Sequence, residues 1–118
     1  MLIKVLKSKL HRARVTDTKP HYPGSIEVDE SLMWAAGMVP YESVLIADVD
    51  NGNRFETYLV PGEPGAGRIV VLGAAARLVK PKDTIIILGF AYCTPEEATQ
   101  FTPRVVVLDE NNRVVTPS

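Results

Sequence analysis

Residues able to take part in chemistry lie in four short segments of this chain, KLHR (9–12), HYPGS (21–25), NGNRFETY (51–58) and GAAA (73–76). Lys9 and His11 are two residues apart, so on a strand their side chains share one face. The guanidinium of Arg54 is suited to holding a carboxylate through two parallel hydrogen bonds. Each segment also has a plain structural interpretation: solvated strand residues around Lys9 and Arg54, a simple turn at Gly24-Ser25, and a strand-to-helix turn at GAAA.

Other common kinds of site find little support. His11 and His21 are the only histidines and Cys93 is the only cysteine, so we expect no metal site. A Ser-His-Asp triad stays open, although no G-x-S-x-G motif is present. The glycine-rich segment PGEPGAG (61–67) lacks the G-K-[ST] ending of a phosphate-binding loop, and we interpret it as a hairpin-like loop.

Size and charge narrow the class of protein. A chain of 118 residues suits one domain. The net charge of −1 argues against a protein that binds nucleic acid or a membrane surface by electrostatic attraction. No apolar run approaches the ~18 residues of a membrane span, and the start of the chain lacks the apolar core and cleavage site of a signal peptide. We therefore expect a cytoplasmic protein without disulfides.

Short strands must position these residues. Alternating or β-branched runs predict strands in 1–6, 12–17, 25–29, 67–73, 83–92 and 103–115, with a turn near Asn111-Asn112 in the last. Asn51-Gly52 predicts a hairpin within 43–61. Asp29 is a helix N-cap for 30–36, which Gly37 could close, and Thr94 begins a capping box for a helix through Thr99. Many short strands with few helices predict a compact β-barrel.

The same four segments, in this order, resemble the aspartate 1-decarboxylase family, whose members depend on a pyruvoyl group. AAG (35–37), KPKD (80–83) and PEEA (95–98) extend the resemblance over nearly the whole chain. It implies a mainly β fold, a six-stranded double-psi β-barrel with a few short helices. It also implies a homotetramer with active sites between neighbouring subunits.

For function, the resemblance implies a carboxy-lyase that converts L-aspartate to β-alanine and CO2 for pantothenate synthesis. Autocatalytic cleavage between Gly24 and Ser25 would give chains 1–24 and 25–118. Ser25 would become the covalent pyruvoyl group, which forms a Schiff base with the substrate amine. Whether a maturation factor is needed stays open.

The family motifs also imply roles for individual residues. The implied catalytic residues are Ser25 as cofactor precursor, Gly24 at the cut, Thr57 as hydrogen-bond donor to the oxyanion of cleavage, and Tyr58 as proton donor. The implied substrate-binding residues are Lys9, Arg54, His11, Tyr22, Gly73, Ala74 and Ala75. We expect glycine at position 24 because a Cβ there would crowd the attack and because glycine accepts strained dihedrals.

Two positions depart from the family pattern. Leu72 stands where the family usually has asparagine before GAAA, which removes an amide donor from a position near the site. Pro23 fixes its own φ and favours an extended Tyr22 next to the bond that must break. Two alternatives therefore remain open: a non-catalytic barrel that serves as a binding module, and a self-processing decarboxylase for another amino acid.

Overall fold

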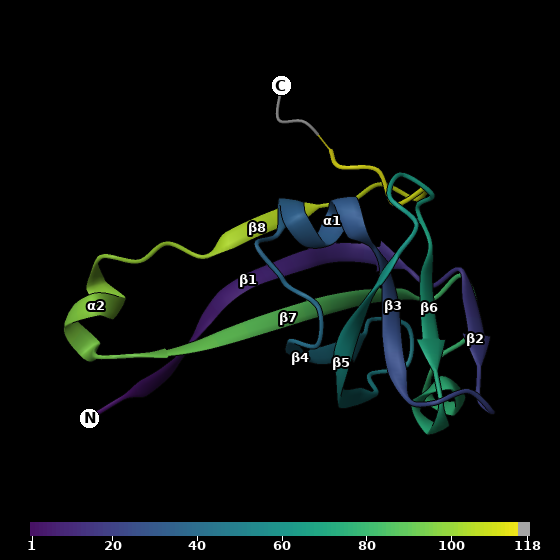
Figure 1. The fold of residues 1–118 in the computed structure, drawn as a ribbon, viewed down its shortest axis with the longest axis horizontal. Helices are drawn as coiled ribbons and strands as arrows, with labels where there is room; N and C mark the ends of the chain where they lie inside the picture. The colour runs from purple at the N-terminus through teal and green to yellow at the C-terminus, as the bar shows by residue number, and fades with distance from the viewer. Residues whose placement is uncertain (116–118) are drawn as a thin grey trace.

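The fold is mainly β, as the sequence predicts. A computed structural model of the protein describes residues 1–115. Eight strands follow one hydrogen-bonded order, β2-β6-β3-β5-β4-β7-β1-β8, and the helices are short (Figure 1). Six of these strands form the continuous middle of the order, and the short strands β2 and β8 add one at each end. No helix within residues 1–115 is long and apolar enough to cross a membrane.

The first half of the chain contains β1 (Ile3–Arg14), β2 (Asp17–Lys19), β3 (Ser25–Asp29), α1 (Glu30–Ala35) and β4 (Ser43–Asp48). The second half contains β5 (Arg54–Gly62), β6 (Ile69–Leu72), the 3-10 helix η1 (Ala74–Leu78), β7 (Thr84–Cys93), α2 (Pro95–Thr99) and β8 (Arg104–Val107). The predicted hairpin is confirmed, since β4 and β5 pair in antiparallel fashion across the Asn51-Gly52 turn. The turn near Asn111-Asn112 returns the chain so that Leu108 bridges Val114.

β1 differs from the sequence prediction because it is one strand of 12 residues rather than two shorter strands. Its register against β7 shifts twice, between Leu6 and Ser8 and between Leu10 and Ala13. Arg12, within the second shift, has a φ of +65°. Such bulges insert an extra residue and interrupt strict alternation, which is why the sequence pattern divides this strand in two.

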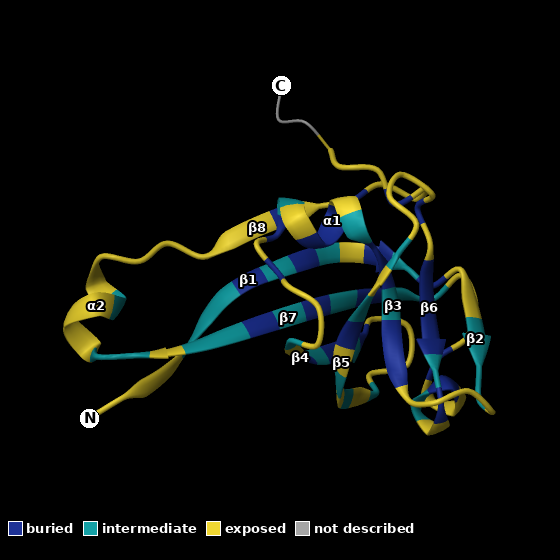
Figure 2. Ribbon diagram, viewed as in Figure 1, coloured by how far each residue is buried: buried dark blue, intermediate teal, exposed yellow. Residues whose placement is uncertain are grey.

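The core is formed mainly by buried residues along the strands, which are dark blue in Figure 2. Ile26 and Leu59, which are partners in the parallel pair of β3 and β5, are fully buried. Full burial of each such side chain contributes about 1.5–3 kcal/mol to folding. Along β6, Ile69 to Val71 are buried without alternation, whereas Ile86 and Leu88 of β7 are half-buried. β7 therefore has one face against the core and one that is partly open.

Asp29 connects two local structures that the sequence shows separately. Its carboxylate accepts hydrogen bonds from the backbone and hydroxyl of Ser31, at 2.9 and 2.6 Å, and so caps α1 as predicted. It also accepts from the N–H groups of Gly65 and Gly67, at 3.0 and 2.8 Å. Burial raises the pKa of Asp29, but these hydrogen bonds outweigh it and hold that pKa below its usual value.

These bonds also correct the prediction for PGEPGAG. A hairpin would require β5 and β6 to pair with each other, but both strands pair instead with β3, which lies between them. The segment therefore crosses the end of β3 and is held there by the carboxylate of Asp29. The sequence near residues 61–67 does not indicate this arrangement, because it depends on β3, a distant segment, lying between β5 and β6.

Candidate active site

Ser25 begins β3 beside the end of β6. It pairs with Leu72, and only 5% of its surface is exposed. Gly24, immediately before it, is exposed. Figure 1 shows β3 starting at the end of the molecule where β6 finishes. The peptide bond between Gly24 and Ser25 therefore joins an exposed loop to a buried strand.

Gly73 packs directly on Gly24. A Cβ built on Gly73 would lie 2.5 Å from the Cα and 2.9 Å from the nitrogen of Gly24. The backbone of Gly73 has φ +83° and ψ −159°, which only glycine adopts readily. Its N–H donates to the carbonyl of Lys19 at 2.9 Å, and the N–H of Tyr22 donates to that same carbonyl at 3.3 Å. The carbonyl of Lys19, a residue that no sequence motif marks, thus ties the loop before the cut to the end of β6.

Gly24 itself is under no such constraint in the folded chain. Gly24 is not among the residues with positive φ. A Cβ at Gly24 would meet its nearest neighbour, the carbonyl oxygen of Leu72, at 3.9 Å, which is ordinary van der Waals contact. In the folded chain the crowded, glycine-requiring position is therefore residue 73 rather than residue 24.

β5 presents candidate residues on both of its faces. Arg54, Glu56 and Tyr58 alternate as exposed residues, whereas Thr57 is half-buried on the opposite side. Because Ile26 pairs with Leu59, continuing the parallel register by one residue places Tyr58 beside Ser25. Glu56 lies between Arg54 and Tyr58 on the exposed face. Sequence reasoning missed it because a glutamate on an alternating strand carries no special signal.

The loop and the 3-10 helix frame Ser25 on the other side. Tyr22 is 54% exposed, and the Nζ of Lys19 lies 4.9 Å from the centre of its ring. Such a cation–π contact contributes about 0.5–1 kcal/mol at an exposed site. Ala74 and Ala75 begin η1, directly after Gly73. GAAA is thus the tight strand-to-helix turn that its composition permits, and it lies next to the candidate cleavage site.

Lys9 and His11 lie on a different part of the molecule. Both are half-buried and alternate with the buried residues Ser8 and Leu10, so they share one face of β1 as predicted. The Nδ1 of His11 is buried and has no hydrogen-bond partner within the described part of the chain. In the strand order, β5, β4 and β7 separate β1 from β3. One chain therefore does not bring Lys9 and His11 to Ser25 through strand pairing.

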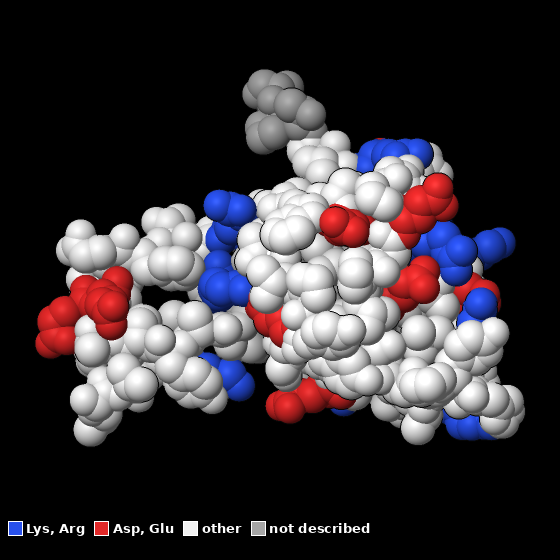
Figure 3. Space-filling view, in the orientation of Figure 1, with Lys and Arg blue, Asp and Glu red and all other residues white. Residues whose placement is uncertain are grey.

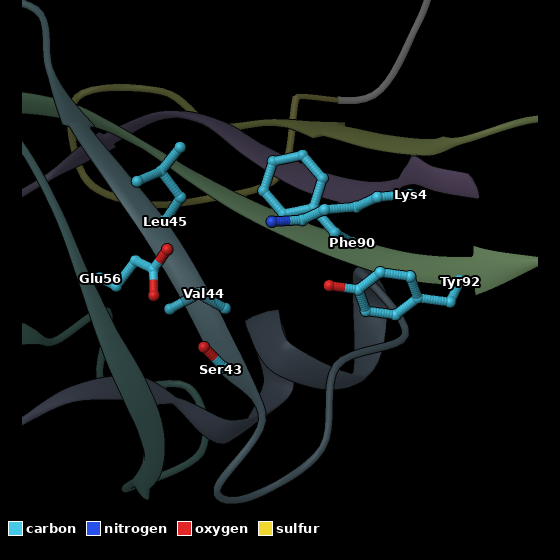
Figure 4. A pocket seen from close by; sticks show the side chains of 7 residues that line it. All are labelled: Lys4, Ser43, Val44, Leu45, Glu56, Phe90 and Tyr92. Atoms are coloured by element: carbon cyan, nitrogen blue, oxygen red, sulfur yellow. The ribbon is translucent and has the colours of Figure 1, made fainter. Parts of the chain in front are cut away.

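A cavity of about 310 Å³ opens on the face formed by β4, β5 and β7 (Figure 4). Its lining residues are Lys4, Ser43, Val44, Leu45, Glu56, Phe90 and Tyr92. None of the candidate site residues named from the sequence lines it. Figure 3 shows positive and negative side chains interspersed over the visible face, without a large region of one sign.

Comparison with known proteins decides the family. The sequence profile described as aspartate decarboxylase matches residues 1–115. The chain belongs to the aspartate decarboxylase family. It is 50% identical to an aspartate 1-decarboxylase of Caldicellulosiruptor saccharolyticus over 98% of this chain and 90% of the relative. It is 53% identical to the enzyme of the same name from Bacteroides thetaiotaomicron over 92% of this chain and 93% of the relative.

A third relative, an aspartate 1-decarboxylase of Salinibacter ruber, is 49% identical over 97% of this chain and 78% of its own length. The region matched to the aspartate decarboxylase family therefore includes the segments of β1, β3, β5 and η1 that carry the candidate residues. Membership confirms the resemblance read from KLHR, HYPGS, NGNRFETY and GAAA. Aspartate decarboxylation is the carboxy-lyase activity that the family name states.

Proposed function

We propose that this chain is a self-processing, pyruvoyl-dependent aspartate 1-decarboxylase that makes β-alanine and CO2 from L-aspartate for pantothenate synthesis. The observation that carries the proposal is the placement of Ser25. In a chain of this family, a nearly buried serine follows an exposed glycine at a strand start, with Leu72 opposite it and Tyr58 beside it. A simple surface turn would leave the serine in solvent.

Maturation would begin at this bond. The Ser25 oxygen attacks the carbonyl carbon of Gly24, the C–N bond breaks, and an ester joins the two parts. Elimination across Cα–Cβ of Ser25 releases the Gly24 carboxylate, and one water then replaces the nitrogen, which leaves as ammonia. The Thr57 hydroxyl, on a half-buried residue of β5, would donate to the oxyanion. Donors of this kind stabilise a transition state by about 2.7–4 kcal/mol in other enzymes.

The residues around Ser25 fit a pyruvoyl group. Conversion of Ser25 needs no added volume, and the pairing of residue 25 with Leu72 holds the start of β3. The group supplies an electrophilic ketone and a sink for the electrons that decarboxylation leaves behind. Arg54 binds a substrate carboxylate, and Tyr58, on the same exposed face of β5, donates a proton to the carbon that loses CO2.

Assembly is part of this proposal. Lys9 and His11 lie beyond β5, β4 and β7 from Ser25 in the strand order. A homotetramer with sites between subunits would let β1 of one copy supply Lys9, as a second cation for the dicarboxylate substrate, to the Ser25 of another. A cytoplasmic location fits this role.

Denaturing mass spectrometry tests the proposal on the purified full-length protein. We expect fragments 1–24 and 25–118 together with release of β-alanine from L-aspartate. Ser25→Ala removes the nucleophile, so both fragments and β-alanine should disappear. The matched control, Ser31→Ala, removes only the hydroxyl that donates to Asp29 and should still be cleaved.

Two outcomes would contradict the proposal. Wild-type chains that stay intact after prolonged incubation, in the presence of cell extract as a source of any maturation factor, would exclude self-processing. Retained β-alanine formation by Ser25→Ala would exclude Ser25 as the cofactor precursor. A parallel assay with glutamate tests substrate choice, since one methylene alone discriminates only about 10–200-fold.

A further inference from the structure

Three carboxylates converge at the end of the β4–β5 hairpin. Asp48 ends β4, Asp50 lies in the turn, and Asp83 precedes β7. One carboxylate oxygen from each lies within 4.8 Å of the others. The antiparallel pair of β4 and β7, in which Asp48 is the partner of Ile85, brings the two segments together.

Backbone donors fix the direction of each carboxylate. The N–H of Asp50 donates to Oδ1 of Asp48 at 2.8 Å. Thr84 donates to Oδ2 of Asp50 at 2.7 Å, and Lys80 donates to Oδ2 of Asp83 at 3.0 Å. One oxygen of each side chain is thus held by the backbone. Three restrained oxygens form a preorganised set of hard ligands.

Asp48 gives independent evidence for a missing partner. It is only 2% exposed, and its buried Oδ2 receives no hydrogen bond from a donor in the described residues. Its side-chain neighbour is instead the carboxylate of Asp83, so the two facing carboxylates need a proton or a cation between them. A buried carboxylate without compensation costs several kcal/mol. The two ion pairs formed by residues 1–115 join Lys7 to Glu42 and Arg68 to Glu27, so neither neutralises this cluster.

We propose that Asp48, Asp50 and Asp83 bind one hard divalent cation, with Ca²⁺ the best match. Ca²⁺ takes oxygen ligands at about 2.3–2.6 Å, so ligands on opposite sides of the ion are about 4.6–5.2 Å apart. Three oxygens within 4.8 Å of one another therefore fit one Ca²⁺ coordination sphere. Mg²⁺ demands near-ideal octahedral geometry and gives up its bound waters reluctantly, so a set of three protein carboxylates suits Ca²⁺ better. Asp50 is exposed and Asp83 half-buried, which gives the ion an entry path and room for coordinating waters.

The ion would join the β4–β5 turn to the segment before β7, close to Arg54 of the proposed active site. The same turn leads directly into Arg54 at the start of β5. It is also tied to the end of η1, because the amides of Asn51 and Asn53 donate to the carbonyl of Leu78 at 3.0 and 2.9 Å. The cation would hold the hairpin, η1 and the start of β7 in one arrangement, which is a stabilising role and not a catalytic one.

Calcium titration of the chelator-treated, full-length protein tests the site. CaCl2 should raise the melting temperature in a saturable way, with a dissociation constant of about 10⁻⁴–10⁻³ M by calorimetry, as for other weak oxygen sites. MgCl2 should bind more weakly. No saturable Ca²⁺ binding to the wild type would overturn the proposal. So would a wild type that ignores Ca²⁺ and responds only to pH, because Asp48 and Asp83 would then share a proton.

Variants locate the binding. Asp48→Asn and Asp50→Asn should each lose the calcium-dependent shift, and the exposed Asp50 provides a test even if a change at the buried Asp48 impairs folding. Glu63→Gln removes an exposed carboxylate from another loop and should retain the full shift. An undiminished shift in either aspartate variant, or loss of the shift in Glu63→Gln, would overturn the assignment.

Discussion

The Cα of Gly73 lies against Gly24 so closely that a single added methyl group on Gly73 would fall 2.5 Å from the Gly24 Cα. The contact joins the end of β6 to the residue before Ser25. It does so with two residues that have no side chains, so the distance cannot be relieved by a rotamer change. Gly73 therefore holds the exposed side of the bond whose cleavage we propose.

Gly73→Ala should destabilise the fold and slow cleavage. The new Cβ collides with backbone, and the φ of +83° costs a further ~1–2 kcal/mol for an L-residue. We expect a total loss of about 2–4 kcal/mol in urea unfolding, together with a lower rate of fragment formation. Gly65→Ala is the matched control, since its φ is +81° but no atom lies within 4 Å of its Cβ position. An equal loss in both variants would show that the contact with Gly24 contributes nothing.

Gly24→Ala separates packing from chemistry at the cut. The nearest atom to its Cβ position is 3.9 Å away, and its φ is not positive. We expect unfolding free energy to change by no more than about 0.5 kcal/mol. Any fall in cleavage rate would then report on the attack by Ser25 itself. A large loss of stability measured by urea unfolding would contradict the geometry described for this residue.

Leu72→Asn should speed maturation. Leu72 pairs directly with Ser25 across β3 and β6, and it is half-buried. An amide there adds a hydrogen-bond donor next to the proposed oxyanion, whereas leucine offers none. Time-resolved mass spectrometry should show a faster appearance of fragment 25–118. Leu72→Met, which adds no hydrogen-bonding group, is the control and should cleave at the wild-type rate. A slower Leu72→Asn would refute a donor role for this position.

Asp48→Asn should change how stability depends on pH. Burial, with the neighbouring Asp83 adding to it, raises the pKa of Asp48 to about 6 in the fold. The folded protein thus binds this proton more tightly than the unfolded chain, whose aspartates have a pKa of about 3.9. Without divalent cations, the stability from this group is complete below about pH 4 and is lost as pH rises to about 6.

The measurement is the difference in unfolding free energy between the wild type and Asp48→Asn in chelator. The asparagine can keep the hydrogen bond from the N–H of Asp50 and can donate its amide to Asp83. The variant should therefore be relatively more stable at pH 7 than at pH 4. Asp29 has a lowered pKa and the opposite slope, but it is present in both proteins and cancels. A difference that does not vary with pH would contradict the raised pKa.

Arg54→Ala should weaken substrate binding more than it slows turnover. Arg54 is exposed at the start of β5, on the same face as Tyr58. Loss of a bidentate contact with a carboxylate should raise KM by about tenfold or more, equivalent to ~1.4 kcal/mol. Arg68→Ala, which removes a cation held 3.5 Å from Glu27, should leave KM unchanged. An unaltered KM in Arg54→Ala would remove Arg54 from the binding site.

The sequence alone determined the features that depend on neighbours along the chain. Asp29 caps α1, Thr94 forms the capping box of α2, and Asn51-Gly52 forms the turn of the β4–β5 hairpin. Each of these features needs only groups a few residues away. Alternation likewise predicted β3 with both of its ends. The ordered motifs were sufficient to indicate the family.

Only the tertiary structure decided which distant segments meet. The double shift in β1, the passage of 61–67 across β3, and the contact of Gly73 with Gly24 all arise from pairing between strands far apart in sequence. Asp48 and Asp83 are separate acidic residues in the sequence, and only the pairing of β4 with β7 makes them neighbours. Local sequence patterns predict the backbone conformation of a residue and its near neighbours. The burial of a carboxylate, or the space left for a Cβ, is set by whichever strand packs against it.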